Sequence, residues 1–379
     1  MSNGPVRILH IINSMNRGGA QSFIMNVYRQ MDRSKIQFDF IVHTYNPCDY
    51  DEEIRSLGGR IFNLRKPYRV GWWGFLYELR STIQQQGPFH AIHSHTHDAG
   101  GFALLIARML GIDIRIAHSH SLSDFAYSSP RNKMTRWLKT KMIRRLATNW
   151  VGSSKSASQV LFGRRWSKDK RSKMVHNGID VIRFTNRLKE KAALREELLI
   201  PSDAPLVGHI GRFSGIKNHR FLVEIFEELL FRIPNARLIL IGDGVLRTEI
   251  QRLVEHKGIQ NHVHLLGHRD DVPELLQELD VLVIPSFKGG VPMVLIEAQA
   301  AGIPCIVSDH IPAEANLKSG FFSFVSLNQD TAVWVQWLLK ALVSEPMSKD
   351  QRILAIQEAG YDIRMAALEL EELYAAKIG

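Results

Sequence analysis

Short apolar runs rich in β-branched residues alternate with helical patterns along all 379 residues, and this alternation strongly limits the possible folds. It is typical of α/β layers built on parallel sheets. The strand-like runs are Val6–Ile12, Phe38–Val42, Arg60–Leu64, Ala91–Ser94, Arg115–His118 and Asn149–Gly152 in the first half, and Leu206–Gly211, Arg237–Ile241, His262–Leu266, Val281–Pro285 and Pro304–Ser308 in the second. We therefore predict two doubly wound domains with a cleft between them, each binding ligands at the carboxyl ends of its strands.

The chain is too long for one ordinary core, which favours two domains. The segment Val175–Asp180 contains the turn signal Asn177–Gly178 and is the best candidate for the join. We place an N-terminal domain at residues 1–180 and a C-terminal domain at residues 181–357. The tail, Gly360–Ile378, has a charged helical pattern.

Charge is distributed unevenly between the two halves. Up to Arg187 the chain has 29 Lys and Arg against 12 Asp and Glu, net +17, and the remainder has 19 against 26, net −7. The basic half could face an anionic membrane, a phosphorylated acceptor or nucleic acid, or its charge could serve only solubility. Two cysteines and no long apolar run at the N-terminus lead us to expect a cytoplasmic protein without a secretion signal.

The segment Pro285–Gly302, PSFKGGVPMVLIEAQAAG, contains candidate phosphate-binding residues. We expect Gly290–Val294 to open a helix after a strand, and a helix N-terminus offers amides and a positive dipole end to an anion. Glu297 would lie on the first turns of that helix and could accept both hydroxyls of a ribose. Its alternative role is a partner of the helix dipole.

Arg212 and Lys217 follow the strand Leu206–Gly211 and could bind a diphosphate, Arg as a fork and Lys as a point charge. Both would stabilise charge that grows on a leaving phosphate without transferring a proton. They could also be ordinary surface cations. Gly18 and Gly19 follow the first strand and resemble a phosphate loop, but the full GxGxxG pattern is missing, so this signal alone favours a plain turn.

Histidines are dense at HSHTHD (93–98) and HSH (118–120). His93, His95 and His97 alternate and could lie on one face of a strand. That spacing suggests a metal, but no cysteine or glutamate nearby completes a ligand set, so we predict no metal site. Instead His118 could contact a sugar, while His95, Asp98 and His120 could bind or activate an acceptor hydroxyl.

Six ordered blocks carry a resemblance that covers essentially the whole chain. They are MNRGGAQ (15–21), RIAHSH (115–120), HNGID (176–180), GRFSGIKNH (211–219), IGDG (241–244) and PSFKGGVPMVLIEAQAAG (285–302). The sequence resembles family 4 retaining glycosyltransferases, most closely bacterial exopolysaccharide-biosynthesis members. This implies the GT-B architecture, in which two Rossmann-like domains face a central cleft, and a final helix, 358–379, that returns to the first domain.

The resemblance also implies roles for particular residues. The N-terminal half would bind the acceptor, and the C-terminal half would bind a nucleotide sugar, expected to be a UDP-sugar. Arg212 and Lys217 match the diphosphate pair, Glu297 matches the ribose-binding glutamate, and His118 matches the histidine beside the transferred sugar. Further donor-site matches are Gly18, Gly19, Gly242, His268, Arg269, Gly290, Val291, Pro292, Met293 and Val294. Transfer in this family retains configuration, needs no metal or other cofactor, and is described as a front-face displacement without a protein nucleophile.

Gly289 departs from the family pattern, which has a glutamate contacting the donor sugar at this position. The sugar could be held differently, the chain could be an engineered or degenerate variant, or water could replace the carboxylate. We therefore predict weakened or altered donor use. A nucleotide-sugar binder without activity and a sugar-nucleotide epimerase are the rival functions.

The stretch Arg131–Trp150 interleaves cations with apolar residues at helical spacing, as an interfacial helix does. We predict peripheral contact with an anionic membrane through it, near a saccharide or lipid-linked acceptor. The alternative is a domain helix that packs its apolar residues inward. We expect no nucleic-acid partner, because no nucleic-acid recognition motif accompanies the basic charge.

Overall fold

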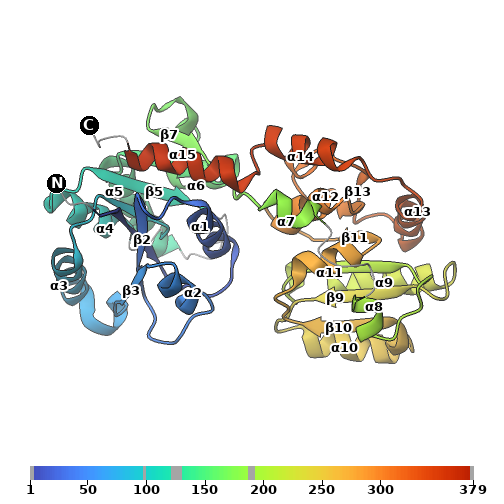
Figure 1. Ribbon diagram of the computed structural model, residues 1–379. Coiled ribbons are helices and arrows are strands. Elements are labelled where there is room, and N and C mark those ends of the chain that lie inside the picture. Colours follow the sequence, from blue (N-terminus) through green and yellow to red (C-terminus); the bar gives the residue numbers. More distant parts are fainter. Residues whose placement is uncertain (1–3, 97–99, 121–129, 187–192, 376–379) are drawn as a thin grey trace. The chain divides into compact units, whose positions relative to one another are not determined.

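A computed structural model describes residues 4–96, 100–120, 130–186 and 193–375 of the chain (Figure 1). The chain forms two compact units, one of Met1–Gly178 with Asp362–Gly379 and the other of Ile179–Tyr361. These divisions lie within a few residues of the predicted ones at 180 and 357. We call the two parts unit 1 and unit 2 and describe each by itself.

Unit 1 is built on a seven-stranded parallel sheet with the order β3-β2-β1-β4-β5-β6-β7. Its strands are β1 (Val6–Ile12), β2 (Ile36–Val42), β3 (Arg60–Asn63), β4 (Ala91–Ser94), β5 (Ile114–Ser119), β6 (Asn149–Gly152) and β7 (Ser172–Met174). Its helices are α1 (Gly19–Gln30), α2 (Asp51–Ser56), α3 (Pro67–Gln86), α4 (Gly100–Met109), α5 (Pro130–Leu146), α6 (Lys155–Phe162), the 3-10 turn η2 (Trp166–Lys168) and the C-terminal α15 (Ile363–Ala375).

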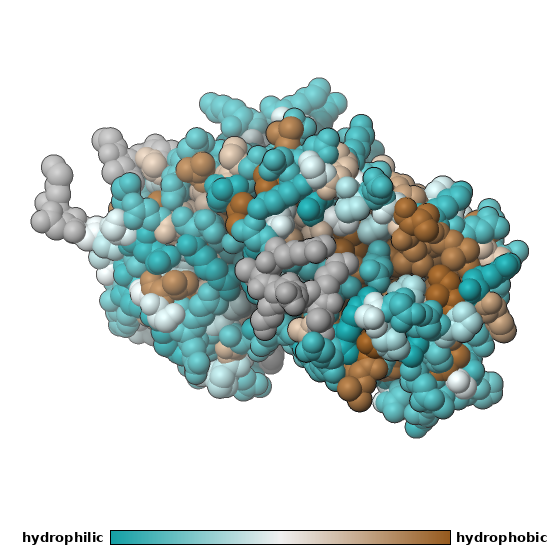
Figure 2. Space-filling view, turned by 45° about the vertical axis from the view of Figure 1, so that its right-hand side comes forward, coloured by the Kyte–Doolittle hydropathy of each residue, from teal (hydrophilic) through white to brown (hydrophobic). Residues whose placement is uncertain are grey.

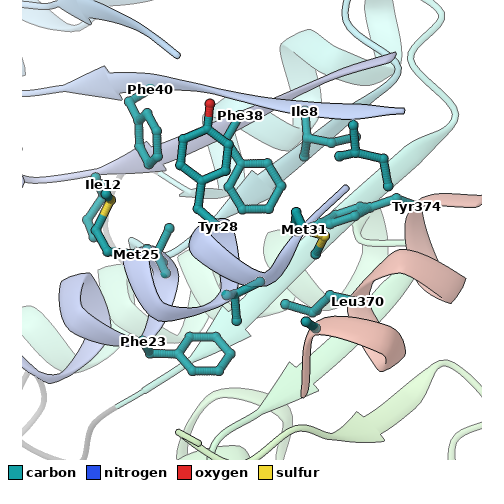
Figure 3. Close-up of a cluster of buried hydrophobic side chains, with 14 of the residues drawn as sticks. Ile8, Ile12, Phe23, Met25, Tyr28, Met31, Phe38, Phe40, Leu370 and Tyr374 are labelled. Carbon is teal, nitrogen blue, oxygen red and sulfur yellow. The ribbon is translucent and has the colours of Figure 1, made fainter. Parts of the chain in front are cut away.

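Side chains of β1 alternate between two cores, one on each face of the sheet. Ile8 and Ile12 pack with α1 and α15, whereas Leu9 and Ile11 pack with α3, α4 and α5. Figure 3 shows the first core, where Tyr28 stacks on Phe38 with ring centroids 4.8 Å apart. Leu370 and Tyr374 of α15 complete that core, so the end of the chain covers the same sheet face as α1.

Unit 2 repeats this plan with a six-stranded parallel sheet of order β10-β9-β8-β11-β12-β13. Its strands are β8 (Leu206–Ile210), β9 (Arg237–Ile241), β10 (Val263–Gly267), β11 (Val281–Ile284), β12 (Cys305–Ser308) and β13 (Phe322–Val325). Its helices are α7 (Val181–Thr185), α8 (Ala193–Glu197), α9 (His219–Leu230), α10 (Arg247–His256), α11 (Val272–Glu278), α12 (Met293–Ala301), α13 (Thr331–Leu342) and α14 (Lys349–Glu358), with 3-10 turns η3 (Gly215–Lys217), η4 (Gln260–His262) and η5 (Ala313–Ala315).

Two cores also enclose the sheet of unit 2. Phe226 of α9 and Trp334 of α13 are buried on one face, and Leu276 of α11 and Leu295 of α12 are buried on the other. The β-strands at the centre of both sheets are buried on both faces, as parallel sheets require. The predicted fold class, two doubly wound α/β units, is confirmed.

Only part of the stretch predicted as an interfacial helix, Arg131–Trp150, is helical and exposed. Helix α5 ends at Leu146, and Trp150 lies buried in β6, where it stacks on Phe162. Ile143 is buried against the core, whereas Trp137 and Leu138 are 55% and 53% exposed. The prediction was therefore wrong for residues 147–150, because Ala147 and Trp150 are buried in the core and Trp150 belongs to β6.

Most of the visible surface is hydrophilic, with apolar side chains exposed in small groups (Figure 2). Within the described ranges, none of the helices combines the length and the apolar character needed to span a bilayer.

Candidate functional site

Strand order reverses at one point in each sheet, between β1 and β4 in unit 1 and between β8 and β11 in unit 2. Loops from the two neighbouring strands diverge there, which leaves space for a ligand at the carboxyl ends of the strands. In unit 2 the loops at this point are residues 211–218, after β8, and residues 285–292, after β11. They contain most of the predicted phosphate-binding residues.

Lys217 has the environment of an anion-binding cation. Its side chain is mostly shielded from water, and burial lowers its pKa. It forms no ion pair with any residue that the structure describes. A buried ammonium without a counter-ion is costly, and an anionic ligand would offset that cost. Arg212 lies exposed in the same loop and likewise has no acidic partner within the described ranges.

Glycines let the strand-end loops of unit 2 approach one another closely. Gly242 has φ +130°, and a Cβ there would lie 2.2 Å from the carbonyl oxygen of Gly211. The Gly242 amide donates to the carbonyl of Gly267 at 2.7 Å, which connects the loop after β9 to the end of β10. Only glycine fits this crossing, so Gly242 shapes the site through its backbone.

The loop that contains Lys217 is hydrogen-bonded to the second loop at the switch point, residues 285–292. The amide of Phe287 donates to the carbonyl of Ile216 at 2.9 Å. The stem of Lys217 passes Gly211, where an added Cβ would lie 3.3 Å from its Cε atom. The lysine is thus held in place by backbone contacts with both loops.

The N-terminus of α12 offers unsatisfied amides beside this lysine loop. The helix begins at Met293, within the segment Gly290–Val294 that was predicted to open it, and Pro292 occupies the N-cap position in an extended conformation. No side chain caps the helix, and its first turn has no acidic residue. Met293 and Val294 have no acceptor four residues earlier within the helix, so their amides are available to an anion. Gly289, Gly290 and Val291 precede the cap in the loop.

Glu297 lies on the second turn of α12, close to its predicted place, and is half-buried. Burial raises the pKa of its carboxyl to about 7, although the positive charge of Arg183 opposes this rise. The group therefore changes charge near neutral pH. Burial disfavours the carboxylate form when no ligand is bound. Hydrogen bonds donated by two hydroxyl groups would stabilise that form.

The predicted donor-site residues His268 and Arg269 differ in their freedom to bind a ligand. His268 is exposed. Arg269 makes bidentate ion pairs with Glu197 and Asp271, which raise its pKa. Arg269 thus positions the loop after β10, and its side chain is already committed to carboxylates.

In unit 1, Gly18 and Gly19 lie at the start of α1, next to the switch point after β1. Gly18 is the N-cap, no side chain caps the helix, and the first turn has no acidic residue. A Cβ at Gly19 would meet no atom within 4 Å. The helix start therefore has space for an anion beside Gly19, whereas a Cβ at Gly18 would lie 2.7 Å from Gln21 Oε1.

Five histidines from three adjacent strands form a cluster on the α1 and α15 face of the unit 1 sheet. We define the histidine cluster as His10, His93, His95, His118 and His120. Residues two apart along a strand share a face, and His10 is opposite His93 in the β1–β4 register. His10, His93 and His118 are buried, whereas His95 and His120 are half-buried.

Ring nitrogens of the cluster contact one another in two chains. In one, His93 Nε2 lies 3.1 Å from His118 Nδ1, and His93 Nδ1 lies 2.7 Å from the Tyr374 hydroxyl. In the other, His95 contacts His10 Nδ1 at 2.9 Å and His120 Nε2 at 2.8 Å. Burial, reinforced by the neighbouring histidines, lowers the pKa values of His10, His93, His95 and His118 well below their ordinary value.

The sequence identified His95, His118 and His120 as site residues but not His10 or Tyr374 as their partners. His10 could have been recognised from the sequence, because it is a polar residue that interrupts the apolar run of β1, the strand next to β4. Tyr374 is 281 residues from His93, and no local pattern could connect them. His97 and Asp98 lie outside the described residues.

Two doubly wound parallel-sheet units, with candidate anion-binding loops at the switch point of unit 2 and a polar cluster at that of unit 1, are the layout of GT-B glycosyltransferases. Residues 17–183 match Glycosyltransferase Family 4, and residues 190–352 match Glycosyl transferases group 1. The chain is 34% identical to the putative glycosyltransferase EpsF of Bacillus subtilis (strain 168), over 99% of this chain and 97% of the relative. The chain therefore belongs to the glycosyltransferases described by these two models, family 4 and group 1.

More distant proteins share the same layout. An Escherichia coli enzyme named UDP-Gal:alpha-D-GlcNAc-diphosphoundecaprenol alpha-1,3-galactosyltransferase is 24% identical over 98% of this chain and 97% of its own. The crystal structure of Anabaena Alr3699/HepE in complex with UDP has a TM-score of 0.77 at 17% identity, covering 98% of this chain and 100% of that one. A glycosyltransferase from Rickettsia africae ESF-5 has a TM-score of 0.79 at 15% identity, covering 99% and 100%.

Proposed function

We propose that the protein is a retaining glycosyltransferase that moves a hexosyl or N-acetylhexosaminyl group from a UDP-sugar to a saccharide or lipid-linked acceptor in polysaccharide biosynthesis. The observation that carries this proposal is Lys217, which has no ion-pair partner among the described residues, in the same loop as Arg212 and at the same switch point as the uncapped N-terminus of α12. The name of the Escherichia coli relative, which specifies a UDP-sugar and a diphosphoundecaprenol acceptor, supports the donor and acceptor classes.

In the proposed reaction an acceptor hydroxyl oxygen attacks the anomeric carbon while the bond from that carbon to the phosphate oxygen breaks. The hydroxyl proton passes to the departing diphosphate on the same face, so no protein nucleophile is needed. Arg212, Lys217 and the amides of Met293 and Val294 stabilise the charge that develops on the diphosphate. These groups supply the positive charge, and we assign no metal or other cofactor to transfer.

Glu297 would accept hydrogen bonds from the ribose hydroxyls, and His118 would contact the transferred sugar. His95, His120 and Asp98 remain the candidates for the acceptor. We infer a cytoplasmic location from the two buried cysteines, which form no disulfide with each other.

A donor panel tests this function. The protein is incubated with UDP-glucose, UDP-galactose, UDP-N-acetylglucosamine and matching GDP-sugars, with a polyprenyl-diphosphate saccharide as acceptor, and products are followed by mass spectrometry. Calorimetry measures donor binding in parallel. A UDP-sugar should be consumed with one new α-linked product, whereas inversion at the anomeric carbon would contradict the retaining mechanism.

Gly289 favours one second candidate, a nucleotide-sugar binder with little or no activity. The position lies in the loop before α12, and a Cβ there would meet no atom within 4 Å. Binding of a donor without transfer, hydrolysis or epimerisation would support this alternative.

Introducing the missing carboxylate should change the use of donors without harming the fold. In Gly289→Glu the side chain enters open space, and we expect an unchanged melting temperature with a several-fold change in kcat/KM for at least one UDP-sugar. Gly289→Gln is the matched control, because it adds the same volume without charge. Unchanged rates and unchanged donor preference would show that this position does not contact the sugar.

We also propose that unit 1 binds anionic membranes peripherally, at the inner face of the cell membrane. The surface that we call the aromatic–basic patch comprises Trp72, Trp73, Tyr77, Trp137, Leu138, Lys139 and Lys141. Trp73 and Tyr77 are 86% and 75% exposed. Lys139 lies 5.7 Å from the Trp72 ring, which brings α3 and α5 together, and Lys141 lies 4.7 Å from the Trp137 ring. Exposed tryptophans beside lysines are typical of interfacial contact.

Vesicle flotation tests this patch. The protein should float with vesicles containing phosphatidylglycerol and less with pure phosphatidylcholine, and the difference should shrink at high salt. The double variant Trp73→Ala, Trp137→Ala should bind several-fold less than the wild type. The control Phe231→Ala removes an aromatic ring that is 78% exposed in unit 2. Equal flotation of all three proteins, or none with either lipid, would contradict the proposal.

A further inference from the structure

His209 lies buried on β8, two residues before the loop that contains Lys217. Its Nδ1 atom lies 2.8 Å from the carbonyl oxygen of Val283 on β11, the strand on the other side of the switch point. A carbonyl oxygen only accepts, so Nδ1 carries the proton. Burial, together with the neighbouring His219 and Lys217, lowers the pKa of the ring well below its ordinary value. The ring is therefore neutral, and its Nε2 atom has a lone pair.

This lone pair is buried and has no hydrogen-bond partner among the described residues. A buried acceptor without a donor is destabilising, so a native structure that retains one calls for an explanation. The contact with Val283 holds one edge of the His209 ring, and the His219 ring packs against it with centroids 4.5 Å apart. These two contacts fix the direction in which Nε2 points.

The side chain of Lys217 reaches the same place. A Cβ atom on Gly211 would lie 3.4 Å from His209 Nε2 and 3.3 Å from Lys217 Cε, so the lysine and the lone pair border one space that the glycine leaves free. The ammonium group is one bond beyond Cε, and it forms no ion pair with any described residue. An ammonium group has three N–H donors. One can serve the imidazole, which leaves two for phosphate oxygens.

We propose that His209 is a positioning residue for Lys217: its Nε2 atom accepts a hydrogen bond from the Lys217 ammonium and directs the other two N–H groups at the diphosphate. Rotation about the last bonds of the lysine side chain would bring the two nitrogens together. A hydrogen bond to a charged donor is stronger than one between neutral groups and also favours the protonated lysine. The inference rests on the proposed function, because it assigns Lys217 to the diphosphate.

Two substitutions of His209 separate positioning from a purely structural role. His209→Asn keeps an N–H near the position of Nδ1, where it can donate to Val283, but has no acceptor at the position of Nε2. His209→Gln does the reverse and returns an acceptor oxygen near Nε2. If His209 only joined β8 to β11, Asn would be the milder change. We expect Gln to be the milder one.

Binding of UDP, measured by calorimetry on the full chain, is the readout. UDP has the diphosphate charge that develops during transfer. His209→Asn should weaken UDP binding about tenfold, the loss expected for one hydrogen bond to a charged group, and His209→Gln should recover most of it. His264→Asn, on the edge strand β10 of the same sheet, is the matched control and should bind as the wild type does. Thermal unfolding establishes that each variant is folded, and His209→Phe replaces His209→Asn if that variant is not.

A double-mutant cycle shows whether His209 acts through Lys217. In the Lys217→Ala background, His209→Asn should cause no further loss of UDP affinity, because the group that it positions is gone. Losses that simply add, or a Gln variant that binds more weakly than the Asn variant, would overturn the inference. Weakened binding in Lys217→Ala with wild-type binding in His209→Asn would overturn it and leave the proposed function standing. Wild-type binding in both single variants would reject it together with the diphosphate role of Lys217.

Discussion

Replacing Lys217 by alanine should lower kcat/KM for the preferred UDP-sugar by about a hundredfold to a thousandfold, while the protein stays folded. Removing one preorganised charge-stabilising group from an active site typically has an effect of this size on the rate. The effect should fall largely on kcat, because the charge on the diphosphate grows as the bond to the sugar breaks. Steady-state kinetics with varied donor measures both constants.

The environment of Lys217 is the reason to expect a large effect. Its ammonium is shielded from water and has no carboxylate partner within the described residues. Electrostatic interactions with a bound diphosphate are stronger in such a place than at an exposed lysine. The free protein should even gain stability from Lys217→Ala, since the variant loses a half-buried charge that has no carboxylate partner among the described residues. A variant that is more stable but much less active would show both effects together.

Two controls distinguish a specific role from general charge loss. Lys340 lies on α13 over the ring of Trp337, and Lys340→Ala removes the same charge from the outer surface of unit 2. We expect its rates to match the wild type. Lys217→Arg should recover only part of the activity, because a planar guanidinium does not fill the place of a point charge held along Gly211. Wild-type kcat in Lys217→Ala would refute the proposed role.

Local patterns predicted most of the strands because the buried parallel sheet selects β-branched residues on both faces. Val6–Ile12 and Ala91–Ser94 were predicted with the bounds that the structure shows. The edge strand β7, Ser172–Met174, was missed because its three residues are all half-buried and have no apolar run. The edge strand β13, Phe322–Val325, was missed as well, although two of its residues are buried.

In the candidate site, too, local patterns were informative and contacts between distant segments were not. Arg212, Lys217 and Glu297 could be proposed from the sequence because they follow strands or lie early in a helix, and local spacing is enough to place such residues. Contacts between distant segments were not predictable. The His93–Tyr374 contact needs the C-terminal helix to return to unit 1, and the environment of Glu297 depends on packing around α12.

Glu297 should make the stability of the free protein depend on pH. Burial raises its carboxyl pKa from 4.5 to about 7 in the folded chain. Between these two values the native state binds more protons than the unfolded state, so the free energy of unfolding decreases as pH rises through this window. The full penalty is about 3 kcal/mol and is complete above about pH 8.

Glu297→Gln removes the titration and keeps the shape, so the variant isolates this contribution. It should nearly match the wild type in stability near pH 4.5 and exceed it by about 3 kcal/mol at pH 8. Urea unfolding at several pH values measures the difference, and other titrating groups cancel in the comparison. A stability difference that is constant across this range would mean that the Glu297 pKa is ordinary in the folded chain.

Donor binding should show the opposite pH trend if Glu297 accepts the ribose hydroxyls, because only the carboxylate accepts from both. With a pKa of about 7, the carboxyl is about one-tenth ionised at pH 6 and about nine-tenths ionised at pH 8, so the affinity for UDP-glucose should rise up to about tenfold. The diphosphate of UDP-glucose has no group that titrates in this interval, so the trend reports the protein. Glu297→Gln should bind more weakly at pH 8 and without this slope. The same slope in both proteins would assign the proton to another group and leave Glu297 only a structural role.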